Sequence, residues 1–187
     1  MVFNNKIFEQ AGTEDIMKFF TKNTKFDGVC VIHNDVFEDS RGSIWTSYNK
    51  EIHSHLLKFG YDFSHDKFNQ NSKNVLRGIH YDYLTAKLVT CISGSISQFI
   101  VKVDSNKSDF GEYLRFDIDG GSGTSVLIPP GYGNAFVARN HNTIYHYKLA
   151  YPSEYIDQQD QKTVAWNDPR LKINWDIDDP ILSERDA

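Results

Sequence analysis

The sequence lacks several features that mark special classes of protein. Only two of its 187 residues are cysteine and five are proline, which excludes a disulfide-rich scaffold and a proline-rich disordered chain. Cys30 and Cys91 each lie in an apolar run, which favours buried free thiols over a disulfide. No apolar stretch approaches the roughly 18 residues of a membrane span, and residues 1–6 contain no apolar signal-peptide core. We therefore expect a cytoplasmic protein with no membrane partner.

Basic residues are also in short supply. The chain has 20 Lys and Arg against 25 Asp and Glu, which gives a net charge of −5. Non-specific binding to nucleic acid requires a broad basic surface, so we expect no nucleic-acid partner. A small anionic ligand is still compatible with this balance, because a few local Arg and Lys side chains are enough to bind it.

Aromatic residues, in contrast, are abundant, with 13 Phe, 10 Tyr and 3 Trp. Such residues favour β-structure. From residue 75 onward, short apolar runs alternate with glycine-containing turns, which is typical of a β-sandwich or barrel. The expected strands span residues 28–32, 44–48, 75–81, 87–92, 97–103, 113–118, 125–128, 135–138 and 143–149.

Helical patterns are confined to short segments outside the main run of strands. Residues 13–22 begin with a Thr cap and acidic residues, and residues 51–59 are followed by a glycine, so each predicts a short helix. The tail from residue 152 is polar but contains two tryptophans, which predicts that it packs on the body. We expect a single domain with an arm (1–27), a barrel (28–151) and a C-terminal segment (152–187).

One stretch concentrates side chains that could carry chemistry. Residues 75–81 (VLRGIHY) place Arg77 and His80 in one predicted strand, and Lys87 begins the next. Regular alternation puts His80 and Gly78 on one face and Arg77 on the other, unless Gly78 marks a bulge. A buried His needs a hydrogen-bond partner, so His80 is either a satisfied core residue or a functional group.

The sequence also argues against a metal centre. Small barrels of the cupin class often hold a metal through His-x-His on one strand and a His after Pro-x-Gly on a later strand. Here the first segment reads His80-Tyr81-Asp82, and Asn134 stands where the later His would be. His, Asp and Asn form a poor ligand set for a transition metal. We expect no metal, which disfavours a metal-dependent oxygenase or isomerase.

Six motifs occur in a characteristic order: RGIHY at 77–81, KLV at 87–89, IPPGY at 128–132, YK at 147–148, WNDP at 166–169 and LSERD at 182–186. The ordered set resembles the dTDP-4-dehydrorhamnose 3,5-epimerase family, although no single motif is specific. The resemblance runs from about residue 28 to residue 186. It implies an all-β fold, a cupin (double-stranded β-helix, jelly-roll) barrel with short N-terminal and C-terminal helical segments. It also implies a metal-independent epimerase without a cofactor, acting on a nucleotide-linked 4-keto-6-deoxy sugar in surface-polysaccharide biosynthesis.

The resemblance implies four catalytic residues. His80 matches the base, Asp186 the carboxylate that orients it, Lys87 the cation that stabilises the enolate, and Tyr147 the acid on the opposite face. A ketone at C4 makes the C3 and C5 protons only weakly acidic, so the reaction needs a base, an opposed acid and a group that holds the enolate oxygen. A His–carboxylate pair favours the imidazolium.

The resemblance further implies residues that bind substrate. Arg77 and Arg41 match arginines near the pyrophosphate, where a guanidinium can make two hydrogen bonds. Lys67, Asn69 and Asn134 are also expected to bind substrate, and Asn134 stands where family members commonly have His. Residues 68–74 also match the family pattern poorly. The nucleotide (dTDP, GDP or CDP) and the sugar (hexose or heptose) therefore stay open.

Several alternatives stay open at this point. An epimerase acting at C3 alone or a 3,4-ketoisomerase would use a similar site. A non-catalytic cupin that only binds a nucleotide sugar belongs to another class, and the presence of an opposed acid and base speaks against it. We expect a homodimer in which a partner covers the arm and the unpaired edge strands.

Overall fold

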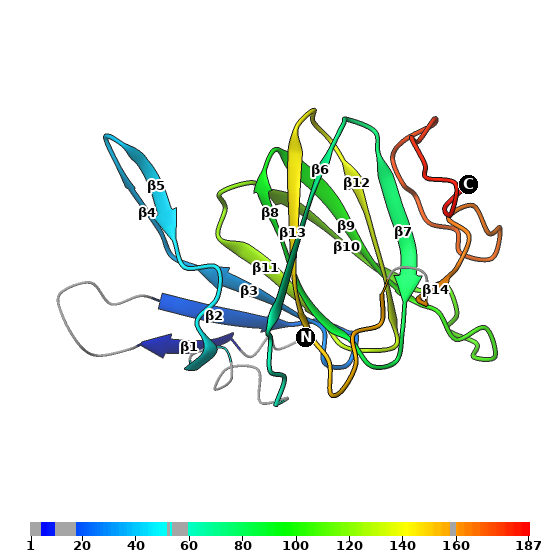
Figure 1. The fold of residues 1–187 in the computed structure, drawn as a ribbon, viewed down its shortest axis with the longest axis horizontal. Coiled ribbons are helices and arrows are strands. Elements are labelled where there is room, and N and C mark those ends of the chain that lie inside the picture. The colour runs from blue at the N-terminus through cyan, green and yellow to red at the C-terminus, as the bar shows by residue number, and fades with distance from the viewer. Residues whose placement is uncertain (1–4, 10–17, 52, 54–59, 158–159) are drawn as a thin grey trace.

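The computed structural model describes all residues except 1–4, 10–17, 52, 54–59 and 158–159 (Figure 1). Two antiparallel sheets face each other. The larger sheet has the strand order β1 (Asn5–Glu9), β2 (Lys18–Asn23), β3 (Cys30–Asn34), β11 (Thr124–Ile128), β8 (Ala86–Ser93), β13 (Thr143–Ala150) and β6 (His65–Asn71).

The smaller sheet has the order β10 (Tyr113–Asp119), β9 (Ser95–Lys102), β12 (Tyr132–Ala138), β7 (Leu76–Tyr81) and β14 (Lys162–Thr163). A separate hairpin, β4 (Val36–Asp39) and β5 (Gly42–Trp45), projects away from both sheets (Figure 1). The all-β prediction is confirmed, and every strand expected from residue 75 onward is present.

The alternation of apolar residues along the strands creates the core between the sheets. Val89 and Val126 of the larger sheet pack there with Ile100 and Phe136 of the smaller one, and all four are at most 2% exposed. Each such side chain contributes roughly 1.5–3 kcal/mol by leaving water. The interior is therefore apolar along most of its length, which makes a polar region at one end conspicuous.

The C-terminal segment covers the outer face of the smaller sheet. Trp175 and Leu171 are buried there against Phe99 and Val137, in a second apolar cluster. β14 also extends this sheet by pairing with β7. This packing brings the end of the chain next to β7, at the right of Figure 1.

The first predicted helix is wrong where the structure tests it. Residues 18–22 of the expected 13–22 helix form most of β2, which pairs with β1 on one side and β3 on the other. Two ladders of hydrogen bonds outweigh a weak local helix propensity. Residues 13–17 lie outside the described part of the chain.

Of the second predicted helix, residues 51 and 53 are helical and the others lie outside the described residues. The described part of segment 152–187 contains β14 and turns but no helix. No helix in the described part of the chain has the length and apolarity that a membrane crossing requires.

Candidate active site

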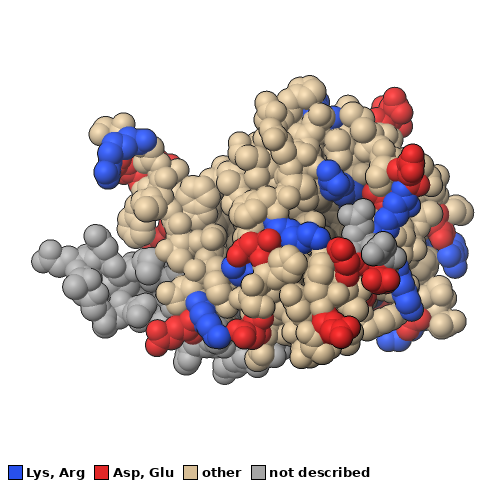
Figure 2. All heavy atoms as spheres, in the orientation of Figure 1, with Lys and Arg blue, Asp and Glu red and all other residues tan. Residues whose placement is uncertain are grey.

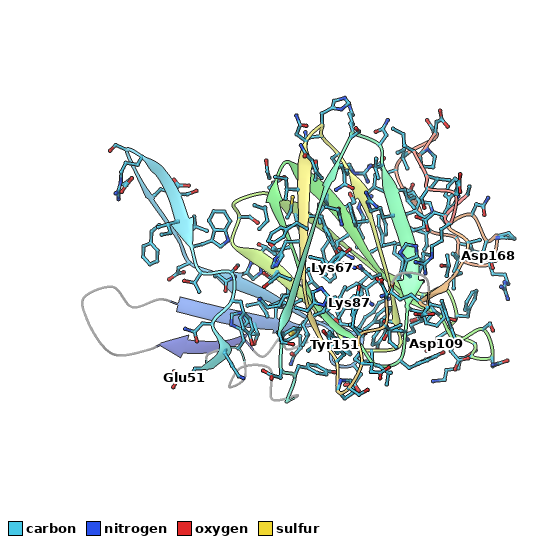
Figure 3. All side chains as sticks on the ribbon, viewed as in Figure 1. Glu51, Lys67, Lys87, Asp109, Tyr151 and Asp168 are labelled. Carbon is cyan, nitrogen blue, oxygen red and sulfur yellow. The ribbon has the colours of Figure 1, made fainter. Side chains whose placement is uncertain are left out.

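A polar cavity of about 120 Å³ opens between the two sheets and the C-terminal segment. The larger sheet lines it through β6, β8 and β13, and the smaller sheet through β7 and β12. Eight of the nine residues singled out in the sequence line this cavity: Lys67, Asn69, Arg77, His80, Lys87, Asn134, Tyr147 and Asp186. Figure 3 shows Lys67 and Lys87 between the strands of the two sheets.

A distortion of β7 at Gly78 places Arg77 and His80 on the same side of the strand. Leu76 and Ile79 pack in the outer cluster, so the alternation slips by one residue at Gly78. Gly78 has φ of +123°, and the register with β12 shifts at the same level. The bulge that the sequence left open is therefore present, and it turns both functional side chains into the cavity.

Gly78→Ala is expected to destabilise the protein and to remove its activity. A Cβ there would lie 2.6 Å from both the Ala135 Cβ and the Asn134 carbonyl oxygen, in addition to the unfavourable φ. Strain and overpacking together cost roughly 2–5 kcal/mol, measurable by urea unfolding. Gly42→Ala is the matched control, because Gly42 has a similar φ of +127° and nothing within 4 Å. Equal losses in the two variants would contradict the role of the close contact.

His80 and Asp186 form a hydrogen-bonded pair at the floor of the cavity. His80 Nε2 lies 2.6 Å from Asp186 Oδ1, and Ser183 Oγ donates to Asp186 Oδ2 (3.0 Å). Burial of Asp186 alone would raise the pKa of its carboxyl. The hydrogen bond and charge of His80, with hydrogen bonds from Ser183 and the Gly78 backbone, outweigh burial and lower that pKa. The pairing leaves Nδ1 as the ring nitrogen of His80 available to a substrate.

The lowered pKa of Asp186 predicts a stability contribution that depends on pH. A carboxyl whose folded pKa lies below its usual 3.8 stabilises the fold above that pH, and the contribution is lost as the pH falls through the folded pKa. Asp186→Asn should therefore be less stable than the wild type at pH 7. In urea unfolding the difference should shrink at pH 3 and below. An unchanged difference across this range would contradict the assignment.

Lys87 is a buried cation in the wall of the cavity. Its side chain is 7% exposed, and its Nζ lies 3.7 Å from Asp82 Oδ2, farther than a hydrogen bond. Burial lowers the pKa of Lys87, and the nearby Asp82 partly opposes this effect. Backbone N–H groups of Leu84 and Thr85 hold the other oxygen of Asp82. The ammonium is thus in place to attract a negative oxygen in the cavity.

Tyr147 enters the cavity from the sheet that faces His80. It lies on β13, next to Val89 on β8 and Lys67 on β6. Tyr145, two residues earlier on the same face, packs edge-on against the Tyr147 ring at 5.5 Å. An imidazole and a phenol therefore project into one cavity from opposite sheets.

The mouth of the cavity carries further polar and basic groups. Arg77 Nε donates to Asn71 Oδ1 (2.8 Å), and the buried Asn71 donates in turn to Asn69. Lys67 donates to the hydroxyl of Tyr155 (2.5 Å). These contacts hold Arg77 and Lys67 at the rim.

Arg41 lies apart from this site. It is at the tip of the β4–β5 hairpin, its side chain is 88% exposed, and it pairs with Asp39 (2.5 Å). The hairpin projects away from both sheets (Figure 1), so Arg41 does not line the cavity of its own chain. The expected place of Arg41 beside the pyrophosphate is not supported by the geometry of the single chain.

Sequence reasoning missed several residues of the cavity wall. Some come from the C-terminal segment, which has no periodicity that would reveal its path, and others are apolar residues that read as core. These residues are Phe136, Leu149, Tyr155, Gln161, Ser183 and Arg185. Ser183 and Arg185 belong to the LSERD motif. Their closeness in sequence to Asp186 could have identified them as residues of the cavity wall.

Positively charged side chains are concentrated along the wall of the cavity. Four cations, Lys67, Arg77, Lys87 and Arg185, line the cavity with one carboxylate, Asp186. Elsewhere acidic and basic side chains are interspersed, as the face in Figure 2 shows. In the part of the chain that the structure describes, no group of three His, Cys, Asp or Glu side chains could hold a metal ion. The cavity thus combines an opposed imidazole and phenol, His80 and Tyr147, with cations suited to an anionic ligand.

The fold and this site define a double-sheet β-barrel with an opposed imidazole and phenol in its interior. The family model for dTDP-4-dehydrorhamnose 3,5-epimerase matches residues 23–187, so the chain belongs to that family. A dTDP-4-dehydrorhamnose 3,5-epimerase from Escherichia coli K12 is 29% identical over 167 residues, covering 87% of this chain and 89% of its relative.

Solved structures agree with this assignment. The dTDP-6-deoxy-D-glucose-3,5-epimerase of Legionella pneumophila, in complex with dTDP-4-keto-L-rhamnose, superposes with a TM-score of 0.81 at 25% identity, covering 90% of this chain and 89% of the other. A 3'-monoepimerase from Streptomyces bikiniensis, in complex with dTDP-quinovose, gives a TM-score of 0.77 at 25% identity, covering 87% and 83%. The cupin barrel is thereby confirmed.

Proposed function

We propose that this protein is an epimerase that inverts C3, C5 or both of a dTDP-linked 4-keto-6-deoxy sugar, as a step in making a sugar for surface polysaccharide. The observation that carries the proposal is the placement of the His80–Asp186 pair and Tyr147 on opposite sheets of one cavity. Inversion requires a base and an acid on opposite faces of the sugar ring. A protein that only binds a nucleotide sugar has no need of this arrangement.

The proposed reaction passes through an enolate. His80 takes the proton from the carbon next to the C4 ketone, and the electron pair of that C–H bond moves onto the C4 oxygen. Lys87 stabilises the negative oxygen, and its burial strengthens that interaction. The electron pair then returns to carbon, which takes the hydroxyl proton of Tyr147 on the other face. His80 ends protonated and Tyr147 ionised until solvent restores both.

The diphosphate is expected at the basic mouth of the cavity. Arg77 is held there through its Nε by Asn71, and Lys67 and Asn69 line the same cavity. A guanidinium can donate two parallel hydrogen bonds to phosphate oxygens. The Legionella relative binds a dTDP-sugar, which favours dTDP over GDP or CDP.

Deuterium exchange tests the proposal. The protein is incubated in deuterated water with dTDP-, GDP- and CDP-linked 4-keto-6-deoxy sugars, and NMR follows C3 and C5. Exchange at both carbons is expected for a 3,5-epimerase. Exchange at C3 alone would identify an enzyme like the Streptomyces bikiniensis 3'-monoepimerase. Exchange at neither carbon with any nucleotide would reject the epimerase and favour a binding protein.

We also propose a homodimer in the cytoplasm. Ile44 and Phe37, on the projecting hairpin, are 72% and 40% exposed, and a partner subunit would cover them. Cys30 and Cys91 are both free thiols, as is usual in a reducing compartment. Sedimentation would detect the dimer.

A further inference from the structure

A buried polar group of three residues lies directly behind the cavity. Gln98 on β9 and Tyr145 on β13 are completely buried, at 0% exposure, within a largely apolar core. Asn134 on β12 links them to the cavity, which its side chain lines. Burying polar groups is costly unless their hydrogen bonds are made, so the directions of these bonds are constrained.

The orientation of the Gln98 amide follows from its backbone neighbours. Its Nε2 lies 3.1 Å from the carbonyl oxygen of Phe99 and 3.0 Å from that of Ala135. A backbone carbonyl only accepts hydrogen bonds, so this end of the amide must be the NH₂ group. The other end, Oε1, then accepts from the Tyr145 hydroxyl at 2.8 Å.

The orientation of the Asn134 amide follows from Gln98. Gln98 Nε2 also lies 2.7 Å from the Asn134 side chain, so the atom facing it must be the acceptor Oδ1. The Tyr145 hydroxyl, 3.3 Å away, faces the same oxygen. The NH₂ group of Asn134 is therefore turned to the cavity. No hydrogen bond of that NH₂ group is found among the described residues.

The NH₂ group of Asn134 lies on the same side of the cavity as His80, the proposed base. Asn134 and His80 are directly paired across β12 and β7, and both side chains line the cavity. The donor therefore stands on the His80 side of the sugar, opposite Tyr147. Unlike a histidine at this place, an amide carries no titrating proton, so it donates over the whole working pH range.

We infer that Asn134 donates a hydrogen bond to a sugar oxygen beside the carbon that His80 deprotonates, and that Gln98 and Tyr145 are positioning residues that hold its NH₂ group in that direction. The inference rests on the proposed function and deepens it. The acceptor is an oxygen of the sugar, either the C4 oxygen that becomes negative or a neighbouring hydroxyl.

Asn134→Asp tests the donor, because it keeps Oδ1 and exchanges the NH₂ group for an acceptor oxygen. We expect kcat/KM to fall at least tenfold, about 1.4 kcal/mol of transition-state stabilisation. A fall in kcat would indicate that the acceptor is the C4 oxygen, which becomes negative during the reaction. A rise in KM would indicate that the acceptor is a neighbouring hydroxyl. If the wild type exchanges deuterium and Asn134→Asp keeps the wild-type kcat/KM, this inference is overturned and the proposed function stands. No exchange by the wild type would overturn the proposed function as well.

A readout independent of activity is the side-chain NH₂ signal of Asn134 in a ¹⁵N NMR spectrum, identified by its loss in Asn134→Asp. It should shift when the dTDP-sugar is added and stay in place with dTDP alone. An equal shift with dTDP alone would assign the donor to the nucleotide and overturn the sugar contact.

Tyr145→Phe tests the positioning role, because it removes one hydroxyl and leaves the ring packed. We expect a three- to tenfold fall in kcat/KM in the wild type and no further fall when Asn134 is already Ala, since Tyr145 acts through Asn134. Equal falls in both backgrounds would show a merely structural effect and overturn the role. Tyr132→Phe is the control, because its hydroxyl donates to the Asp27 carbonyl.

Discussion

His80→Asn is expected to abolish deuterium exchange at both C3 and C5 of the nucleotide sugar. Asparagine is smaller than histidine and can still donate a hydrogen bond to Asp186, so the fold should survive. It has no basic nitrogen and cannot accept the proton. Loss of a general base typically lowers a rate by roughly 10²–10⁴-fold, which NMR exchange in deuterated water would measure directly.

The control for this variant is His141→Asn. His141 lies in the exposed turn between β12 and β13, where its ring accepts a hydrogen bond from the Lys73 backbone at 3.4 Å. Its replacement should leave exchange unchanged. Full activity in His80→Asn would show that the base is another group and would remove the main support for the mechanism.

Tyr147→Phe is expected to separate proton exchange from inversion. The ring stays packed against Tyr145, but no phenolic proton reaches the face of the enolate opposite His80. His80 can still remove and return a proton on its own face, so exchange should persist. The formation of inverted product should fall by roughly 10² or more.

Chiral analysis of the product sugar by NMR, alongside the exchange rate, would check this expectation. Tyr132→Phe should retain both exchange and inversion, because its hydroxyl bonds to the Asp27 carbonyl outside the cavity. Normal inversion by Tyr147→Phe would mean that another acid protonates the opposite face. Loss of exchange as well would mean that Tyr147 is needed before the enolate forms.

The strands from residue 75 onward were predictable because their apolar residues recur at the period of a strand and glycines separate them. β6 was missed for the opposite reason. Its inward side chains, Lys67, Asn69 and Asn71, are polar because they line or support the cavity, so the segment 65–71 lacks apolar alternation. The same polar alternation is what a strand in the wall of a binding site should show.

The predicted helix at residues 13–22 illustrates the other kind of failure. A Thr cap and acidic residues favoured a helix, whereas pairing with β1 and β3 makes residues 18–23 a strand. Pairing partners lie at other places in the chain, and the local pattern carries no information about them. Helix propensity is a weak preference that such pairing overrides.

The sequence by itself determined the β-rich character, the positions of the main strands and the residue types of the active site. Only the tertiary structure decided which faces and neighbours these residues have. The bulge at Gly78 brings Arg77 and His80 to one side, and the covering C-terminal segment brings Asp186 to His80 across 106 positions. The β4–β5 hairpin carries Arg41 away from the cavity. Buried carbonyls behind Asn134 set the direction of its amide. These outcomes depend on close packing between distant segments, whereas residue type and strand period are local properties of the chain.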